Sequence, residues 1–197
     1  MKIRMLNAEP LYDYREANKI TQGVDLDGVN KMPPNDLVKW WVKQIIANHS
    51  TLRCIKFRII DERPKSVVMQ LIRATKGHPQ PEVQSSRPDW NNGKERSSDP
   101  YETILFMQDH TAESFIEMAK QRLCNRTEGR TLSAMTEIVR ELRRSENPFL
   151  KAVGICARPQ CEWTCGCTEI KGCGKYKKFS DYILKEFENG QESKGDK

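Results

Sequence analysis

Residues 52–73 read LRCIKFRIIDERPKSVVMQLIR and change their hydrophobic period within one continuous stretch. In the first half Phe57 and Ile59 alternate with charged side chains, as the residues of a half-buried strand do. After Pro64, which suits the first turn of a helix, apolar residues recur at helical spacing. The stretch therefore predicts a strand at residues 52–60 followed by a helix, and with it a fold of the α/β (α+β) class.

The flanking sequence predicts further elements of both kinds. Residues 2–6 alternate between polar and apolar side chains, which predicts a first strand. A helix after Pro34 carries Trp40 and Trp41 on its apolar side, where we expect them to pack in the core or at a subunit interface. Three more helices are predicted from their apolar stripes, at residues 111–124, 131–144 and 180–187.

Two segments are rich in loop-forming residues, namely the one that ends at Pro34 and residues 78–100. We expect both to be loops, and we expect His78 and His110 to be loop residues because neither has a carboxylate or a second histidine at helical ligand spacing. The predicted organisation is one domain over residues 1–188 and a charged tail over residues 189–197.

The charge balance indicates which classes of ligand the protein favours. The 197 residues carry 33 Lys and Arg against 27 Asp and Glu, a net charge of +6, and the basic residues are spread along the chain. This excess favours phosphate-bearing ligands, whereas specific DNA binding is not expected. The sequence contains no run of about 18 apolar residues and no signal-peptide core. We therefore expect no membrane segment and a cytoplasmic location.

Arginine, glutamine and serine side chains recur through the middle of the chain. Gln70 and Arg73 stand three residues apart, so both project from one side of a helix end. The later members of the series are Ser85, Ser86, Arg87, Arg96 and Arg122. A guanidinium donates two parallel hydrogen bonds to phosphate, although a single arginine is more often a solvated surface residue. The order of these residues along the chain is what distinguishes them from scattered surface arginines.

That order resembles the flavin-dependent thymidylate synthases. In this family a helix with Gln-x-x-Arg-His-Arg is followed by a loop that ends in Ser-x-Arg-Tyr. An Arg four residues before a Pro and an arginine before the last long helix come later. The matching residues here are Gln70 and Arg73, Ser85 and Arg87, Arg96 with Pro100, and Arg122 within the run from Arg122 to Arg126.

The resemblance implies a mixed sheet flanked by helices and a homotetramer whose sites form between subunits. The implied reaction methylates deoxyuridine monophosphate (dUMP) at ring carbon five, with methylenetetrahydrofolate as carbon donor, NADPH as reductant and FAD as hydride carrier. The implied nucleotide contacts are Gln70, Arg73, Ser85, Ser86, Arg87 and Arg96, and Arg122 is the implied catalytic residue that stabilises the ionised ring. The implied cofactor contacts are Arg73, Ala74, Thr75 and Glu82.

Departures from the family pattern fall on the flavin side. The Arg-His-Arg triplet reads Arg73-Ala74-Thr75, and the family's Asn-Ala-Arg reads Thr111-Ala112-Glu113. These changes remove cations that would neutralise the flavin diphosphate, and Glu113 adds a charge of the wrong sign. Two alternatives follow from them: a pyrimidine-nucleotide hydroxymethylase, or a non-catalytic nucleotide-binding protein that has lost the flavin.

Five of the seven cysteines lie between residues 156 and 173, namely Cys156, Cys161, Cys165, Cys167 and Cys173. Four thiolates can surround zinc, and cysteine-rich loops can also hold iron–sulfur clusters, although the paired Cys-x-x-Cys of common zinc sites is missing. The alternative is a set of reduced structural thiols, and Cys173-Gly174-Lys175 resembles the end of the family's cysteine-containing tail. Cys54 and Cys124, which have no partner in the sequence, are expected to be buried.

Overall fold

The computed structural model describes residues 1–23, 26, 28–74, 81–84 and 98–192. Within this part of the chain the strands are β1 (Lys2–Met5), β2 (Phe57–Pro64), β3 (Glu82–Val83) and β4 (Thr103–His110). The α-helices are α1 (Pro10–Gln22), α2 (Pro34–Ala47), α3 (Lys65–Arg73), α4 (Ala112–Arg122), α5 (Gly129–Arg144), α6 (Pro148–Cys156), α7 (Gln160–Trp163) and α8 (Phe179–Glu192). Two 3-10 helices, η1 (Val29–Lys31) and η2 (Ser50–Cys54), complete an α/β fold.

The four described strands form one sheet in the order β1-β2-β4-β3. Every pairing between them is antiparallel, so the mixed sheet that the resemblance implies is wrong for this part of the chain. The physical reason lies in the burial of the strands. Along β2 and β4 buried residues alternate with more exposed ones, as in an antiparallel sheet with one covered face, whereas parallel strands are usually covered on both faces.

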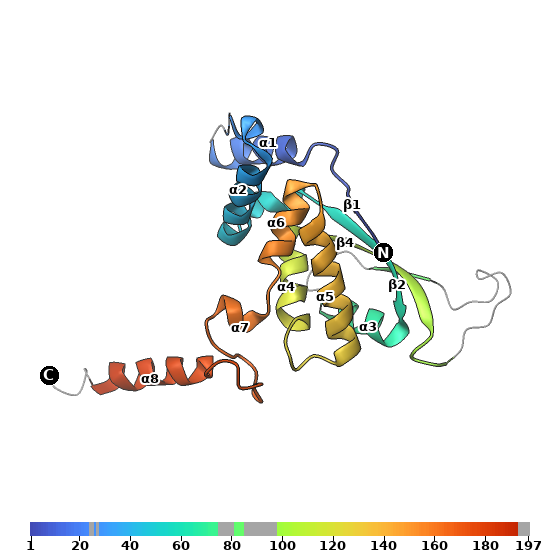
Figure 1. The fold of residues 1–197 in the computed structure, drawn as a ribbon. Helices are drawn as coiled ribbons and strands as arrows, with labels where there is room; N and C mark the ends of the chain where they lie inside the picture. The colour runs from blue at the N-terminus through green and yellow to red at the C-terminus, as the bar shows by residue number, and fades with distance from the viewer. Residues whose placement is uncertain (24–25, 27, 75–80, 85–97, 193–197) are drawn as a thin grey trace.

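The helices form a layer against this sheet. Figure 1 shows α4, α5 and α6 in front of the strands, with α1 and α2 at the upper end of the layer and α8 extending from the body. The core lies between the layers, and Trp41, only 1% exposed, joins it through an edge-to-face contact with Phe149 at 5.0 Å between ring centroids. Trp40 is partly buried beside it. The expectation that both tryptophans pack inward is confirmed.

The predicted strand at residues 2–6 and the helices at residues 111–124 and 131–144 are confirmed as β1, α4 and α5. The strand predicted at residues 52–60 begins later than expected, because Ser50–Cys54 is a 3-10 helix before β2. The last predicted helix is longer than expected, since α8 continues to Glu192. The boundary proposed at residue 188 stays a prediction.

Several elements lie where no helix or strand was predicted. The segment before Pro34 contains η1 and α1, which begins at Pro10 and buries Tyr14 and Asn18. Residues 101–110, to which no element was assigned, contain β4, and His110 at its end is 1% exposed, so the expectation of a loop histidine is wrong. The predicted loop at residues 78–100 contains the two-residue strand β3. The helix α6 ends at Cys156 and packs on α2 and α5, and the short α7 lies within the cysteine-rich segment.

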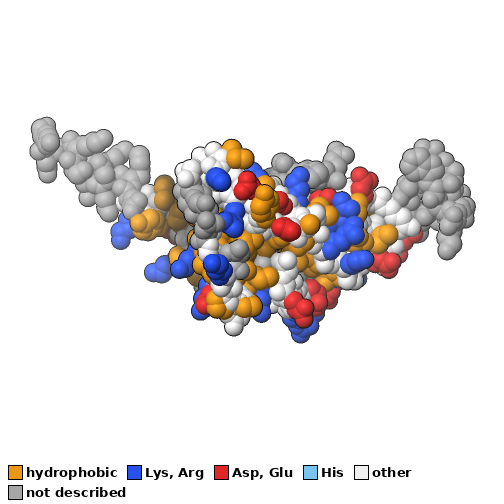
Figure 2. All heavy atoms as spheres, turned by 90° about the horizontal axis from the view of Figure 1, so that it is seen from above, with side chains coloured by type: hydrophobic (Ala, Val, Ile, Leu, Met, Phe, Trp, Pro, Cys, Tyr) orange, Lys and Arg blue, Asp and Glu red, His pale blue; other side chains and the backbone are white. Residues whose placement is uncertain are grey.

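The exterior carries charges of both signs. On the face in Figure 2, Lys and Arg side chains are interspersed with Asp, Glu and hydrophobic side chains. Among the described helices, none combines the length and apolar character that crossing a membrane would require.

Candidate functional site

An open cleft of about 590 Å³ lies beside the C-terminal ends of α3 and α4 and the segment that follows α7. Gln70 lines it from α3, and Arg122 lines it from the last turn of α4. The other lining residues are Glu117, Lys120, Gln121, Cys124, Arg126, Thr127, Glu128, Gln160, Thr168 and Glu169. The wall is mainly polar and contains three cations, so the cleft suits a charged ligand better than an apolar one.

Arg122 lines the cleft, and Arg73, which does not line it, is close enough for its charge to act on Arg122. Arg73 ends α3 and Arg122 ends α4, where a positive charge complements the helix dipole. Burial lowers the pKa of Arg122, and the neighbouring charge of Arg73 lowers the same pKa further. The buried Nε of Arg122 has no hydrogen-bond partner among the described residues. A buried donor beside a second cation is a costly arrangement unless an anion joins it.

Three acids line the cleft, namely Glu117, Glu128 and Glu169, and the first two have partners of their own. Glu117 pairs with Lys120, with 2.5 Å between Oε1 and Nζ. Glu128 caps α5, where its carboxylate accepts the backbone N–H groups of Arg130 and Thr131 at 3.0 and 2.9 Å. Within the described part of the chain, neither Arg73 nor Arg122 forms an ion pair.

The structure brings together part of the predicted nucleotide site. Gln70 and Arg122 line the cleft, and Arg73 lies close enough to Arg122 to act on its pKa. The remaining candidates, Thr75, Ser85, Ser86, Arg87 and Arg96, lie outside the described residues. Sequence analysis missed Lys120, Gln121, Arg126 and Thr127, although the polar run that follows the apolar stripe of α4 marks where the chain turns into the cleft.

The proposed cofactor contacts that the structure describes do not form a cationic cradle. Ala74 is fully buried in the core, and Glu82 is exposed on the edge strand β3 and does not line the cleft. At the position of the family's Asn-Ala-Arg, Thr111 caps α4 through a capping box with Ser114. Glu113 pairs with Arg53, whose Nε lies 2.8 Å from its Oε2. Both departures therefore have a structural role of their own.

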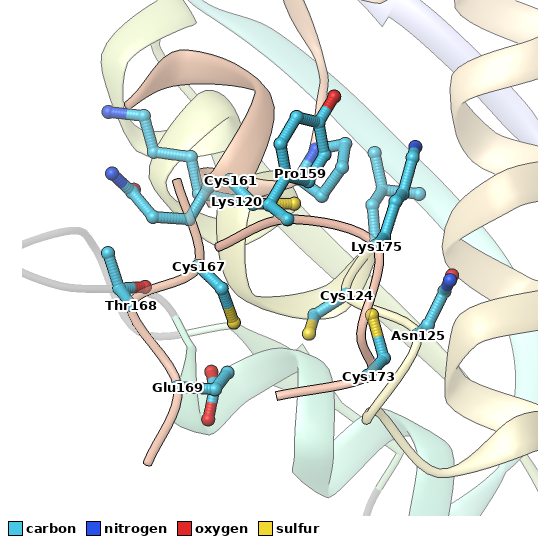
Figure 3. Close-up of a pocket in the computed structure, with 13 residues that line it drawn as sticks. Lys120, Cys124, Asn125, Pro159, Cys161, Cys167, Thr168, Glu169, Cys173 and Lys175 are labelled. Atoms are coloured by element: carbon cyan, nitrogen blue, oxygen red, sulfur yellow. The ribbon is translucent and has the colours of Figure 1, made fainter. Parts of the chain in front are cut away.

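A second, smaller pocket of about 30 Å³ adjoins the cleft. Four cysteines line it, namely Cys124, Cys161, Cys167 and Cys173, and Figure 3 shows them with Lys120 and Lys175 around the same space. The two spaces share Lys120, Cys124, Gln160, Thr168 and Glu169 as lining residues. The cysteine-rich segment is thus a common wall between them.

The lining of this pocket differs from the predicted set of metal ligands. Cys156 and Cys165 do not line the pocket: Cys156 is buried in the core, where burial raises the pKa of its thiol to about 11, and Cys165 is exposed. Cys124 joins instead, and it is partly buried, while Cys54 is exposed, so the expectation that both are buried is wrong. All seven cysteines are free. As the described side chains stand, no three His, Cys, Asp or Glu residues are close enough to hold a metal ion.

Comparison of the chain with protein-family models, with curated proteins and with solved structures finds no match. The resemblance to the flavin-dependent thymidylate synthases therefore rests on the motifs quoted above. The class of protein that fold and site define is an α/β protein with a polar, arginine-bearing cleft next to a thiol-lined pocket.

Proposed function

We propose that the cleft binds a pyrimidine deoxynucleotide, dUMP, and that the chain is a flavin-dependent thymidylate synthase-like enzyme. One observation carries the proposal: Arg122 lines the cleft with a buried Nε that has no hydrogen-bond partner among the described residues, and the charge of Arg73 acts on it from another helix end. The reaction is the one that the resemblance implies, methylation of dUMP at ring carbon five with methylenetetrahydrofolate and NADPH. A homotetramer is the proposed assembly, which sedimentation would test.

The proposed roles follow from the chemistry of the side chains. The exposed Arg73 would hold the phosphate, to which its planar fork can donate two hydrogen bonds. The partly buried Arg122 stabilises negative charge that develops on the pyrimidine ring, because a cation acts more strongly where water is scarce. Gln70 orients the base, since its amide offers both a donor and acceptors. Binding an anion also removes the repulsion between the two guanidinium groups.

The residues that would hold FAD fit less well. When bound, FAD would supply the hydride carrier of the reaction, and its diphosphate needs cations. The buried Ala74 and the acidic Glu82 offer none, and Arg73 already serves the nucleotide. These two positions favour a second candidate function, a nucleotide-binding protein without flavin chemistry. A hydroxymethylase, which keeps the nucleotide site and changes the carbon donor side, is the remaining enzymatic alternative.

Calorimetric titration of the full chain with dUMP tests the nucleotide site. Replacing Arg122 or Arg73 by alanine should weaken dUMP binding by roughly 10- to 100-fold, the effect of removing a charge-assisted hydrogen bond. The matched control is Arg144→Ala, because Arg144 is exposed and pairs only with Glu141 of its own helix among the described residues. Equal dUMP affinity in all three variants would remove the basis for the proposal.

A visible spectrum separates the candidate functions. The full chain is incubated with FAD, freed of excess FAD and then titrated with dUMP. A retained flavin band that shifts with dUMP supports the enzyme and leads to assays of methyl and hydroxymethyl transfer. Intact dUMP binding without retained flavin supports the non-catalytic nucleotide-binding protein.

A further inference from the structure

The small pocket brings Cys124 together with three cysteines that lie close to one another much later in the sequence. Cys124 follows the last turn of α4, Cys161 lies in α7, and Cys167 and Cys173 lie in the loop before α8. Figure 3 shows the sulfur atoms of Cys124, Cys167 and Cys173 around one space, with Cys161 beside Lys120 and Pro159 above it in this view. Thiols from three segments therefore share one pocket although all of them are free.

The backbone holds these thiols in place without any disulfide. The N–H of Cys167 donates to the Lys177 carbonyl at 2.8 Å, and its carbonyl accepts from the N–H of Phe179 at 2.9 Å, which closes the loop that carries Cys173. Gly172 lies against Cys167, because a Cβ at this position would come within 3.0 Å of the Cys167 sulfur. A side chain at position 172 would therefore require the Cys167 sulfur to shift.

The turn after α4 presents Cys124 in the same way. The N–H of Thr127 donates to the Cys124 carbonyl at 2.9 Å, which forms the turn, and the N–H of Arg126 donates to the Cys124 sulfur at 3.5 Å. A backbone N–H directed at sulfur stabilises the thiolate form, which is the form that binds metals. Hydrogen bonds of this kind are also what orients the ligands of a metal site.

The donor set favours a soft cation. Four thiol groups line the pocket, and thiolates bind zinc with sulfur atoms about 2.3 Å from the metal. Lys120 and Lys175 also line the pocket, where they pair with Glu117 and Glu162. An iron–sulfur cluster takes four cysteine thiolates as well, so metal analysis distinguishes it from zinc.

We propose that Cys124, Cys161, Cys167 and Cys173 bind one zinc ion that ties the cysteine-rich segment to the end of α4. The thiols are too far apart to hold the ion as they stand, so binding draws the side chains inward. The proposed zinc ligands do not include Arg73 or Arg122, so the zinc site and the nucleotide site can be disrupted separately.

Metal analysis of the full chain, purified with a thiol reductant and without chelator, tests the site. We expect one zinc ion per chain, exchangeable for Co²⁺ with the absorption of a cobalt–thiolate site. Cys161→Ser and Cys173→Ser should each lose zinc, whereas Cys54→Ser and Cys165→Ser, which change exposed cysteines outside the pocket, should keep it. Arg122→Ala should also keep zinc, so failure of the nucleotide site and failure of the zinc site are distinguishable.

Alkylation of the unsubstituted chain gives a second readout that does not depend on folding of the variants. With zinc bound, Cys124, Cys161, Cys167 and Cys173 should be protected from iodoacetamide, and a strong chelator should expose all four. Three results would overturn the proposal: no zinc after reconstitution, iron with acid-labile sulfide in its place, or disulfides among the four cysteines in the reduced preparation.

Discussion

At the scale of single residues, the surroundings of a cysteine decide its chemistry. The two candidate ligands that the structure removes from the metal set illustrate this, because they lie close in sequence and differ in exposure. Cys156 is 4% exposed, and burial raises its thiol pKa to about 11, whereas Cys165 is exposed. Only the thiolate is nucleophilic, so only a small fraction of Cys156, on the order of 10⁻³ near pH 8, can react at any moment.

Native alkylation checks this difference. We expect Cys156 to resist iodoacetamide in the folded chain at pH 8 while Cys165 is modified, with both sites read by peptide mass spectrometry. In the unfolded chain both should react at similar rates, since the burial that raises the pKa is gone. Equal modification of the two thiols in the folded chain would contradict the assigned environments.

A second prediction at this scale concerns the cap of α5 and its dependence on pH. The hydrogen bonds from the N–H groups of Arg130 and Thr131 lower the pKa of Glu128. A carboxyl whose pKa is lower in the folded state stabilises the fold above its unfolded pKa, about 4.3, and loses that contribution as pH falls. Glu128→Gln should therefore reduce the free energy of unfolding near pH 7 by about 0.5–1 kcal/mol, the usual range for a cap at a helix N-terminus.

Urea unfolding of Glu128→Gln and the unsubstituted chain at pH 7 and pH 3 measures this effect. The difference between the two should shrink at pH 3, where the carboxyl of Glu128 is increasingly protonated. Glu141→Gln is the control, because Glu141 is exposed and pairs only with Arg144 among the described residues. A difference that is the same at both pH values would show that charge plays no part in the cap.

At the scale of elements, Gly154 allows α6 to approach the end of α5 closely. A Cβ at Gly154 would lie 2.7 Å from the Arg143 backbone nitrogen and 2.8 Å from the Leu142 Cβ. Arg143 reinforces the contact, because its Nε donates to the Gly154 carbonyl at 2.8 Å. Here the lack of a side chain matters more than the poor helix propensity of glycine.

Gly154→Ala should therefore destabilise the protein by about 1–3 kcal/mol, the usual cost of overpacking. The matched control is Gly129→Ala in the first turn of α5, where a Cβ would meet nothing within 4 Å. This control should be neutral or stabilising by up to about 1 kcal/mol, because alanine is the better helix former. Chemical denaturation measures both, and a neutral Gly154→Ala would mean that α6 can shift away from α5.

The elements also show how far sequence reasoning reaches. The helices α4 and α5 are predictable because their apolar residues recur at helical spacing and face one core. The strand β4 was not predicted because its buried positions include Gln108 and His110, which are 2% and 1% exposed. Buried polar residues conceal the period of a strand from any pattern of hydrophobicity. Antiparallel pairing and the position of Cys124 depend on contacts between distant segments, which one sequence does not encode locally. The spacing of Gln70 and Arg73 placed both at a helix end, whereas Arg122 came from the resemblance, and the roles of all three stay predictions.

At the scale of the whole molecule, the cleft and the thiol pocket share a wall. Thr168 and Glu169, which line both spaces, lie directly after Cys167. Cys124 is common to both as well, and it is separated from Arg122 by one residue only. Fixing Cys124 and Cys167 on one zinc ion would therefore fix the wall of the cleft beside the end of α4.

The two proposed ligands should consequently assist one another. Zinc-loaded protein should bind dUMP more tightly than the same protein after chelation, with a difference on the order of tenfold, a common size for coupling between sites. Because such coupling is reciprocal, dUMP should slow the loss of zinc to a chelator. Calorimetry measures the first effect, and a chromogenic zinc chelator measures the second. If dUMP affinity is the same with and without zinc while both ligands bind, the shared wall is rigid without metal, and zinc stabilises only the segment that carries the cysteines.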